Sequence, residues 1–400
     1  MQRTGVRQAA VVWSRELVLL AVAVFMLRFG EGMTGGVRAN FFVDTLGLTG
    51  GQVLWLEGAR EVPGLLLIVI AAFLTQLPLA KRGGYALLLM GLGFMAHALV
   101  RSYLALMLIS VLASLGNHIW MPLSPALGLS LATRETCGRV LGRLASVGAL
   151  ASIVGMGALT LVSWLASDVP LGSYYGIGGG LMVVAAVVVL RMPDSVGATE
   201  REQPRMLLNA RYWLFYVLTF FEGARKQVLH SFGTLVLVQS YEFEVWQISL
   251  VLLTSGVINF VSAPWLGAIV DRVGERACLT SSYVVLALSC LGFGLLDAPL
   301  VLAGLVVLQR FLGVLGMGLN TYVHRTAPDE ELTPTLTAGI SINHVTSVIM
   351  PLIAGAVLPF VGYEGVFIGT GALILLSVPF AAAMRIPEAP VASPAPVMAK

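Results

Sequence analysis

Acidic and basic side chains stand at helical spacing inside otherwise apolar sequence near the N-terminus. Arg28, Glu31 and Arg38 fall within a sector of roughly 80° when successive residues are placed 100° apart, so one helix face carries all three. Guanidinium groups bind carboxylates and phosphates, and a carboxyl group beside a guanidinium can change its protonation state when its access to water changes. This face is therefore suited to binding an anion or to transferring a proton.

A second polar face occurs about 190 residues later. Glu222, Arg225 and Lys226 span a sector of about 100°, and His230 widens it to about 140°. Similar stretches, FGEGMTGGVR from Phe29 and FFEGARKQ from residue 220, place a Glu-Gly pair ahead of the basic residues. Ionisable residues in an apolar span normally face a water-filled cavity or a partner, so we expect the same of both polar faces.

Other apolar segments carry isolated polar groups that complete a list of candidates. The candidates for substrate binding are Arg28, Arg38, Asn117, His118, Arg225, Lys226, Arg310 and Asn343. The candidates for proton coupling are Glu31, Glu222, His230 and His344. Two alternatives remain open: ion pairs at i,i+3 or i,i+4 spacing can be purely structural, and a lone membrane histidine can be a hydrogen-bonded packing residue.

The composition excludes a water-soluble protein. The 400 residues are 57% hydrophobic and 11% charged, and their mean hydropathy is +0.88, whereas soluble domains carry roughly 25% charged residues. Cys137, Cys278 and Cys290 form no CxxC pair, and no Walker motif is present. We expect no cofactor, no metal centre, no nucleic-acid partner and no enzymatic activity.

Apolar windows separated by charges, Pro and Gly predict an all-α polytopic membrane protein with twelve transmembrane helices. The first set lies near 17–43, 52–77, 84–100, 103–127, 141–166 and 173–190. The second set lies near 212–238, 246–270, 278–296, 299–323, 336–360 and 364–384.

The basic residues support this arrangement of spans. Of the 24 Lys and Arg residues, six fall inside spans, namely Arg28, Arg38, Arg60, Arg225, Lys226 and Arg310. All the others except Arg101 lie in segments assigned to one side of the membrane. By the positive-inside rule, that side is the cytoplasm, and both termini lie there. We expect a multi-pass protein of the plasma or inner membrane.

The chain divides into two similar parts. We expect an N-terminal six-helix bundle at 1–190, a cytoplasmic linker at 191–211, a C-terminal six-helix bundle at 212–386 and a disordered tail at 387–400. Leu115-Gly116 and Leu315-Gly316 repeat in the fourth helix of each set, as Glu-Gly repeats in the first. Weak internal symmetry of this kind is typical of a duplicated transporter unit.

The segment GAIVDRVGER, which runs from Gly267 to Arg276, resembles the GxxxDRxGRR loop signature of the major facilitator superfamily. The six-plus-six layout extends the resemblance over nearly the whole chain. It implies two pseudo-symmetric bundles around a central cavity that opens alternately to the two sides. The corresponding first-half stretch, QLPLAKRGG, keeps Lys81 and Arg82 but has Ala80 where the signature has its acidic residue.

The resemblance also suggests residues that control the conformational change. Asp271, Arg272 and Arg276 belong to the signature loop. An acidic group at a helix end can pair with a neighbouring arginine in one conformer and separate from it in another. We expect Asp271 to engage the start of the fifth helix near Arg139 or Arg143. A solvated loop residue that only caps the helix end is the alternative.

These observations favour a secondary active transporter of a small, anionic organic solute that is coupled to protons. The spans carry six cationic and four acidic side chains, the acidic ones being Glu31, Glu57, Glu61 and Glu222. The first alternative is a multidrug antiporter, in which Met, Phe and Trp side chains would line a greasy pocket for amphipathic or cationic compounds. A sensor or a membrane enzyme is disfavoured, since the longest loop is short and only His118 with Ser124, or Ser341 with His344, resembles a catalytic pair. We expect a monomer in the lipid bilayer.

Overall fold

The computed structural model describes residues 13–67, 74, 76–133, 136–197 and 208–385, and these residues form helices without any strand. The helices before residue 191 are α1 (Arg15–Asn40), η1 (Phe41–Thr45), α2 (Gly50–Leu65), α4 (Leu79–His97), α5 (Tyr103–Ser130), α6 (Cys137–Leu165) and α7 (Leu171–Leu190). Those after residue 207 are η2 (Ala210–Tyr212), α8 (Trp213–Gln227), η3 (Val228–Phe232), α9 (Gly233–Tyr241), α10 (Val245–Val273), α11 (Glu275–Leu295), α12 (Pro299–Gly313), η4 (Val314–Gly316), α13 (Met317–Thr326) and α14 (Asp329–Ala382).

Eight helical segments in the described part of the chain are long and apolar enough to cross a membrane. One of them, Glu330–Ala382 within α14, covers the predicted span at 336–360 and all but the last two residues of the one at 364–384. Gly362 breaks the helical geometry between these two spans, with φ 68°. The predicted span at 212–238 is divided by the π-turn η3, and the one at 299–323 by the 3₁₀ turn η4. Residues 68–73 and 75 of the predicted span at 52–77 lie outside the described residues.

The predicted start of the third span differs from the structure. The sequence places it near residue 84, whereas α4 begins at Leu79, directly after Pro78. Lys81 therefore belongs to the first turn of α4, where its ammonium group donates to the carbonyl of Leu190 at 3.2 Å and lies 3.6 Å from Asp194. Because the last residue of α7 and the segment that follows it supply these partners, charge in the first turn of α4 is tolerated and the helix extends beyond the apolar window.

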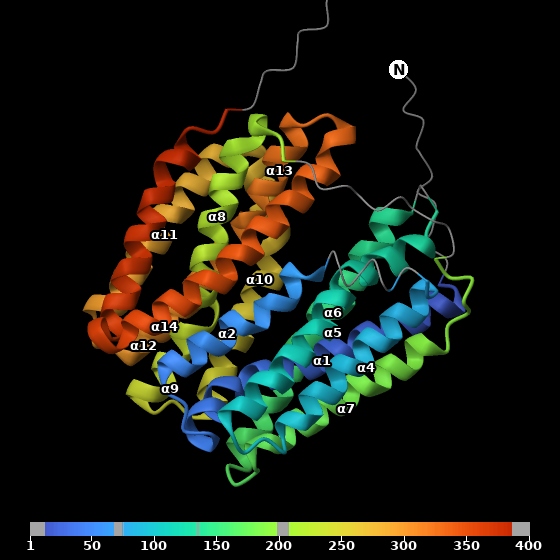
Figure 1. The fold of residues 1–400 in the computed structure, drawn as a ribbon, viewed down its shortest axis with the longest axis horizontal. Helices are drawn as coiled ribbons and strands as arrows, with labels where there is room; N and C mark the ends of the chain where they lie inside the picture. The colour runs from blue at the N-terminus through green and yellow to red at the C-terminus, as the bar shows by residue number, and fades with distance from the viewer. Residues whose placement is uncertain (1–12, 68–73, 75, 134–135, 198–207, 386–400) are drawn as a thin grey trace, which may run out of the picture.

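Helices from the same half of the chain pack against one another. In the first half, before residue 191, α1 packs on α6 and α7, and α4 packs on α5 and α7. In the second half, after residue 211, α14 packs on α8 and α11. The two halves meet where α2 contacts α14 and where α6 contacts α10. Figure 1 shows α4, α5, α6 and α7 together on one side of the molecule, with α8, α11 and α12 on the other and α2 beside α14.

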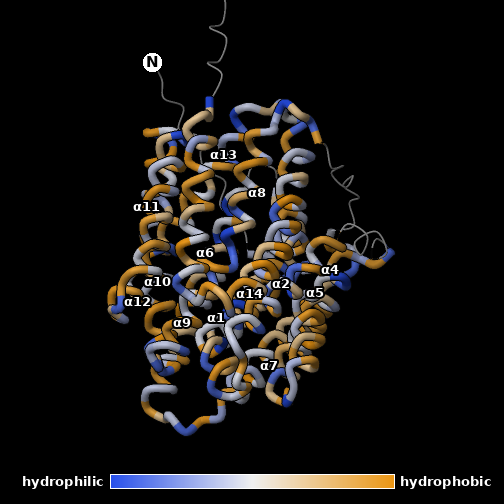
Figure 2. The backbone as a smooth tube through the Cα atoms, turned by 60° about the vertical axis from the view of Figure 1, so that its left-hand side comes forward, coloured by the Kyte–Doolittle hydropathy of each residue, from blue (hydrophilic) through white to orange (hydrophobic). Residues whose placement is uncertain are grey.

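The outer surface of the helices is apolar. Leu104 on α5, Leu161 on α6 and Val261 on α10 have exposed fractions of 66%, 55% and 71%. Exposed apolar side chains in such number would be unfavourable in water but suit contact with acyl chains. Hydrophobic segments run along the outside of the helix assembly in Figure 2. This surface is consistent with a multi-pass membrane protein.

One end of the molecule joins the two halves through hydrogen bonds. We call this end, formed by residues 40–49 and 239–244, the Asn40 end. There the Asn40 amide donates to the carbonyl of Phe243 at 2.8 Å. The Gln239 amide donates to the carbonyl of Leu48 at 2.9 Å. Thr160 on α6 donates to Ser249 on α10 at 2.9 Å. These bonds hold the halves together at the Asn40 end.

Close approach of α1 and α7 depends on a glycine. A Cβ atom on Gly30 would lie 2.6 Å from the carbonyl oxygen of Gly178, whereas a Cβ atom on Gly35 of the same helix would have no neighbour within 4 Å. Small residues at such crossings let membrane helices pack backbone to backbone.

We predict that Gly30→Val destabilises the protein, because the added side chain forces α1 away from α7. Overpacking of this kind costs about 1–3 kcal/mol. Thermal unfolding of the purified protein in detergent measures the effect, and Gly35→Val is the control, since it makes the same exchange in the same helix. Equal losses in the two variants would mean that helix propensity, and not the α1–α7 crossing, causes the change.

Candidate functional site

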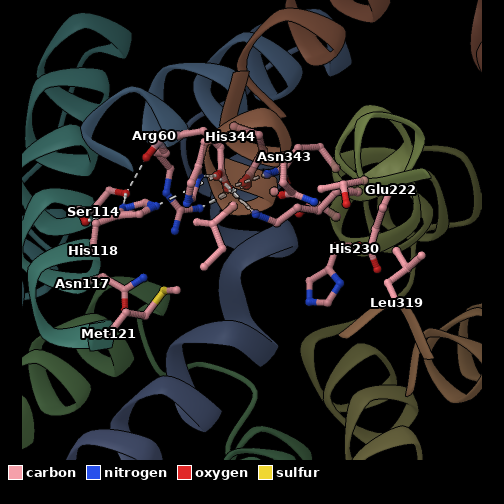
Figure 3. Close-up of a pocket in the computed structure, with 18 of the residues that line it drawn as sticks. Arg60, Ser114, Asn117, His118, Met121, Glu222, His230, Leu319, Asn343 and His344 are labelled. Atoms are coloured by element: carbon pink, nitrogen blue, oxygen red, sulfur yellow. Dashed lines mark hydrogen bonds and ion pairs between the residues drawn. The ribbon is translucent and has the colours of Figure 1, made fainter. Parts of the chain in front are cut away.

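A cavity of about 460 Å³ lies between the two halves and is lined mainly by polar and charged side chains. Its walls come from α1, α2 and α5 of the first half and from α8, η3, α13 and α14 of the second (Figure 3). The lining residues are Arg38, Glu57, Arg60, Glu61, Ser114, Asn117, His118, Met121, Phe215, Thr219, Glu222, Lys226, Gln227, His230, Ser231, Leu319, Asn320, Leu336, Gly339, Ile340, Asn343 and His344.

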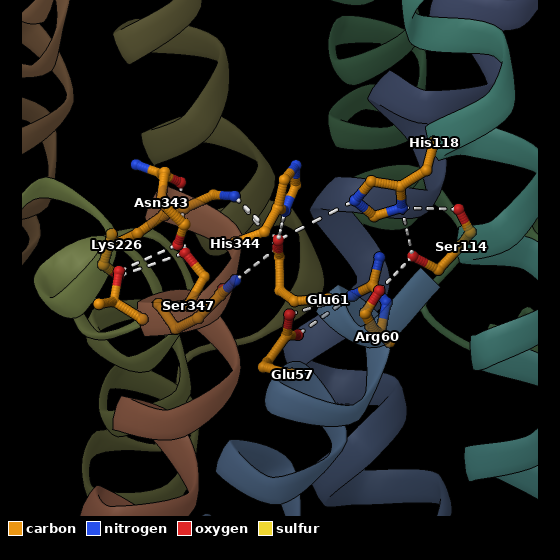
Figure 4. A network of polar contacts seen from close by, with 12 residues as sticks. Glu57, Arg60, Glu61, Ser114, His118, Lys226, Asn343, His344 and Ser347 are labelled. Atoms are coloured by element: carbon orange, nitrogen blue, oxygen red, sulfur yellow. Dashed lines mark hydrogen bonds and ion pairs between the residues drawn. The ribbon is translucent and has the colours of Figure 1, made fainter. Parts of the chain in front are cut away.

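The Glu61 carboxylate on α2 is the centre of the polar network in this cavity (Figure 4). Lys226 donates to both of its oxygens, at 3.1 and 3.2 Å, and Gln227 donates to Oε1 at 2.8 Å. His344 Nδ1 lies 2.9 Å from Oε2 and must donate, because a carboxylate only accepts. Lys226 and Gln227 come from α8 and His344 from α14, so a first-half acid is bound by three second-half residues.

His118 on α5 lies on the other side of Glu61. Its Nδ1 donates to the carbonyl of Ser114 at 2.8 Å, which leaves Nε2 as the nitrogen that faces Glu61 Oε2 at 4.0 Å. The Ser114 hydroxyl donates to the carbonyl of Arg60 at 2.5 Å and thereby ties α5 to α2. The rings of His118 and His344 are 5.0 Å apart between centroids, in an edge-to-face arrangement.

A second acid on α2, Glu57, binds two arginines. Arg60 lies 3.1 Å from Glu57 at i,i+3 spacing, and Arg38 from α1 lies 3.4 Å from it. Arg38 also donates to the hydroxyl of Ser231 in η3 at 2.8 Å. Arg38 therefore connects α1 and α2 with the second half on the side of the cavity nearer the Asn40 end.

Local sequence explains how these groups reach the cavity. Thr49 and Gln52 form a capping box that begins α2, and Glu57 and Glu61 follow at i,i+4 spacing on one helix face. On the opposite wall, the π-turn η3 follows Gln227 directly. A π-turn inserts one residue into the helical repeat, and such turns are frequent at functional sites.

Most of the residues chosen from the sequence lie in this cavity. The lining includes Arg38, Asn117, His118, Glu222, Lys226, His230, Asn343 and His344. Among the described residues, Glu222 has no hydrogen bond or ion pair within 4 Å, although it faces the cavity. The two predicted polar faces thus contribute Arg38 from α1 and Glu222 and Lys226 from α8.

Four other candidates lie outside the lining. Arg28 pairs with Glu31 at 2.7 Å, with half of the Arg28 side chain exposed. Arg225 is buried with its guanidinium 4.1 Å from the centre of the Tyr283 ring, and Arg310 donates to the carbonyl of His230 at 2.9 Å. Arg28 and Glu31 thus form the local pair that the sequence analysis left open as the structural alternative.

The sequence analysis did not assign roles to Glu57, Arg60 and Glu61. They were counted only among the charged residues that fall inside the predicted spans. The available signal was the i,i+4 pair of acids with an arginine between them in an apolar segment, where ionisable residues are functional candidates by default.

The cavity lining carries equal numbers of cationic and acidic side chains, whereas the predicted spans together carry six cationic and four acidic ones. The lining holds three cations and three acids, namely Arg38, Arg60, Lys226, Glu57, Glu61 and Glu222. Two of these groups are arginines that share the single carboxylate of Glu57, whereas Glu222 is isolated from direct partners. Positive charge is therefore concentrated on the side near Arg38 and Arg60.

Three of the lining residues also form a possible ligand set for a metal ion. One donor atom each from Glu61, His118 and His344 lies within 4.8 Å of the others. We expected no metal centre, because the sequence contains no cluster of His, Cys and Asp residues at metal-ligand spacing. The fold creates the spacing by bringing α2, α5 and α14 together.

The residues predicted to control gating lie at the opposite end from Asn40, formed by residues 191–197, 271–276 and 325–328 and called the Asp271 end. Asp271 pairs with Arg325 at 2.9 Å, a partner that the sequence analysis did not name. Arg272 and Arg276 are exposed, and the guanidinium of Arg143 lies 5.6 Å from the ring of Trp13. Engagement of Asp271 with Arg139 or Arg143 stays a prediction for another conformer.

Comparison with known proteins gives a consistent picture. The model of the Major Facilitator Superfamily matches residues 20–333 and 217–399. Among curated proteins, no sequence matches the chain.

Two solved structures with the same fold are a nucleoside transporter, NupG, and a bacterial homologue of the human lysosomal transporter Spinster in an inward-facing and occupied conformation. For NupG the TM-score is 0.76 at 13% identity, with 93% of this chain and 99% of that chain covered. For the Spinster homologue the TM-score is 0.70 at 13% identity, with 93% of this chain and 97% of that chain covered.

The contacts at the Asp271 end generate a prediction about stability. Arg325 also lies 3.1 Å from Glu275, whose side chain is 0% exposed, whereas the Asp271 side chain is 70% exposed. Arg325→Ala leaves a buried carboxylate without its cation, which we expect to cost on the order of 2 kcal/mol, less than for a fully buried pair because Arg325 is partly solvated. Asp271→Asn should change stability by less than about 1 kcal/mol. Thermal unfolding of both variants tests this, and an equal effect would contradict the assigned role of Glu275.

Proposed function

The chain belongs to the major facilitator superfamily of membrane transporters, and from this premise we propose that it moves a small, anionic organic solute by alternating access with coupling to protons. The observation that carries the proposal is the Glu61 network. It joins ionisable groups from both halves of the chain in the wall of a central cavity. A group that both binds the solute and links the halves can couple binding to conformational change.

The proposed architecture follows the predicted boundaries. Twelve membrane helices form two six-helix bundles at 1–190 and 212–386, connected by a cytoplasmic linker at 191–211. Both termini lie on the cytoplasmic side of the plasma or inner membrane, and the protein acts as a monomer. Residues 198–207 of the linker lie outside the described residues. The same is true of the tail at 387–400, the one segment that we expected to be disordered.

We assign the structure to a conformer that is closed at the Asn40 end. The bonds of Asn40 with Phe243 and of Gln239 with Leu48 cross between the halves there. At the Asp271 end, Asp271 and Arg325 pair within the second half, and Lys81 and Asp194 pair within the first. With the Asp271 end in the cytoplasm, this conformer faces inward. Asp271, Arg272, Arg276, Arg139 and Arg143 would then close that end in the outward-facing conformer.

Proton coupling is proposed to act through Glu61 and His344, with Glu222 and His230 as further acceptors in the same cavity. When the halves rock, Lys226 and His344 must move relative to α2, because they belong to the other half. Loss of a cationic partner in a site shielded from water favours protonation of a carboxylate. Each cycle can therefore load and release a proton at Glu61.

The preference for an anion rests on Arg38 and Arg60. These two arginines share one carboxylate, Glu57, so a carboxylate or phosphate on the solute can take the place of Glu57 on one of them. Asn117 and Asn343 supply polar groups on the two side walls of the cavity (Figure 3). Lys226 can contact the solute when it separates from Glu61.

The alternative proposal is a multidrug antiporter for amphipathic or cationic compounds, which Glu222 would attract. The expected pocket of Met, Phe and Trp side chains is not what the described residues form: most lining residues are polar, the large apolar ones are Met121, Phe215, Leu319, Leu336 and Ile340, and no tryptophan from the described part of the chain is among them. The polar character of the lining favours the first proposal.

The substrate class is tested by ligand-induced stabilisation of the purified protein. We predict that at least one organic carboxylate or phosphate ester in a panel raises the unfolding temperature. Neutral nucleosides and lipophilic quaternary ammonium compounds complete the panel. Arg38→Gln and Arg60→Gln should weaken binding of that anion about 10- to 100-fold, since each removes charge-assisted hydrogen bonds. Arg101→Gln, which neutralises an exposed loop arginine, is the control. Stabilisation by lipophilic cations alone, unaffected by either substitution, would favour the antiporter.

Coupling is tested with the identified solute in proteoliposomes. We predict that Glu61→Gln abolishes accumulation driven by a proton gradient but preserves solute exchange without a gradient, because the amide keeps its size and cannot release a proton. Glu330→Gln, at an exposed acid, is the control. Loss of accumulation in Glu31→Gln or Glu222→Gln, with normal accumulation in Glu61→Gln, would move the coupling role to the residues chosen from the sequence.

A further inference from the structure

We propose that Glu61, His118 and His344 form a binding site for a divalent transition-metal ion of the zinc class, and that the bound ion holds the two halves of the transporter in the conformer described above. The donor atoms of the three residues lie within 4.8 Å of one another. Two imidazoles and one carboxylate are a donor set that suits zinc and its neighbours in the first transition series.

The distances require only small side-chain shifts. His344 Nδ1 lies 2.9 Å from Glu61 Oε2, and His118 Nε2 lies 4.0 Å from the same oxygen. Nδ1 of His344 carries the proton of its contact with Glu61, so it becomes a ligand when that proton moves to Nε2 or is released to the cavity as the ion binds. Ligand atoms around a tetrahedral zinc ion, each about 2.0–2.2 Å from the metal, stand about 3.3–3.5 Å apart. The two separations from Glu61 Oε2 bracket this value, and the two imidazole nitrogens lie within 4.8 Å of each other. Rotations of the rings that bring their nitrogens closer together would admit an ion.

The orientation of His118 points independently to a cation. The carbonyl of Ser114 fixes a proton on Nδ1, so in the neutral ring Nε2 presents a lone pair that either a proton or a metal ion can occupy. That lone pair faces Glu61 Oε2, which is also an acceptor, across 4.0 Å. Two acceptors that face each other are unfavourable unless a positive group lies between them. A hydrogen bond that fixes the other nitrogen of a ligating histidine is the usual support of a metal site.

Gly64 provides the space in which the two imidazoles lie. It follows Glu61 by three residues on α2, and a Cβ atom there would stand 2.7 Å from Cε1 and Nδ1 of His344 and 2.8 Å from Cδ2 of His118. Any other residue would force the rings away from α2. The glycine therefore brings both histidines against the carboxylate.

Lys226 sets the strength of metal binding. Its ammonium group lies 3.1 Å from Glu61 Oε1 and competes with an ion for the same carboxylate. The Lys226 side chain is 38% exposed to the cavity, so it can withdraw when an ion enters. Removing the charge of Lys226 should therefore increase the affinity for the metal ion, an effect that is not expected of a cluster with a purely structural role.

A bound ion would restrict movement of the two halves, because its ligands come from both of them. Glu61 and His118 belong to the first half and His344 to the second, so one ion would link α2 and α5 with α14. Rocking of the halves would break a metal–ligand bond. The bound ion should therefore stop transport, whatever the solute and the coupling ion are.

The test is zinc binding to the purified full-length chain in detergent, by calorimetric titration with Zn²⁺ and by thermal unfolding. His118→Gln and His344→Gln should each weaken binding by about 10- to 100-fold or more, as changes at metal sites commonly do. Lys226→Gln should tighten binding. His324→Gln, at an exposed histidine, and His230→Gln, at a cavity histidine outside the triad, should keep the affinity of the unaltered chain.

Cobalt(II) supplies a second measurement that does not depend on stability. Its visible absorption should report coordination by the unaltered chain and change in both triad variants that still elute as folded monodisperse protein. The proposal is overturned if Zn²⁺ does not bind, if His118→Gln and His344→Gln retain the affinity or the cobalt spectrum, or if His230→Gln abolishes binding. Because these readouts need no solute, their outcome is separate from the test of transport.

Discussion

The carboxylate of Glu61 is the interaction on which the arrangement of the two halves depends at the centre of the molecule. An ionised side chain in a membrane interior is unfavourable by several kcal/mol unless charged and hydrogen-bonding partners surround it. Glu61 finds these partners in Lys226, Gln227 and His344, all from the second half. The halves therefore cannot separate at this level without a new partner for the carboxylate, which is the property a coupling site requires.

The bonds at the Asn40 end have a different character. Asn40, Gln239 and Thr160 make neutral hydrogen bonds between the halves, each worth about 0.5–1.5 kcal/mol net. Such bonds are readily exchanged for water when that end opens. The contacts of Glu57 and Glu61 are exchanged less readily, since each carboxylate would lose its charged partners within a membrane-spanning segment. In the proposed transport cycle, the contacts of Glu61 and Glu57 would therefore oppose rocking of the halves more than the bonds at the Asn40 end, and a solute that pairs with the same cations would lower that barrier.

Sequence reasoning predicted properties of single helices and missed those that arise between helices. Gly362 lies in the gap predicted between 336–360 and 364–384, and the family assignment followed from the loop at Asp271. The Arg28–Glu31 pair is local and was anticipated. Glu61 was not selected, because its partners are 165 and 283 residues away and periodicity says nothing about which helix faces which. Arg225 shares the polar face of Lys226 in a helical projection, yet the ring of Tyr283 on α11 takes it out of the cavity.

Several positive groups can compete for the carboxylate of Glu61. Glu61 has two oxygens: Gln227 donates to Oε1, His344 donates to Oε2, and Lys226 donates to both. A proton, the Lys226 ammonium and a metal ion are all positive and all compete for this carboxylate, so the presence of one weakens the binding of the others. By linkage, whatever displaces Lys226 from Glu61 also makes that lysine available to an anionic solute on the opposite wall. Charge balance at a single carboxylate can therefore connect solute, proton and inhibitory ion without any further machinery.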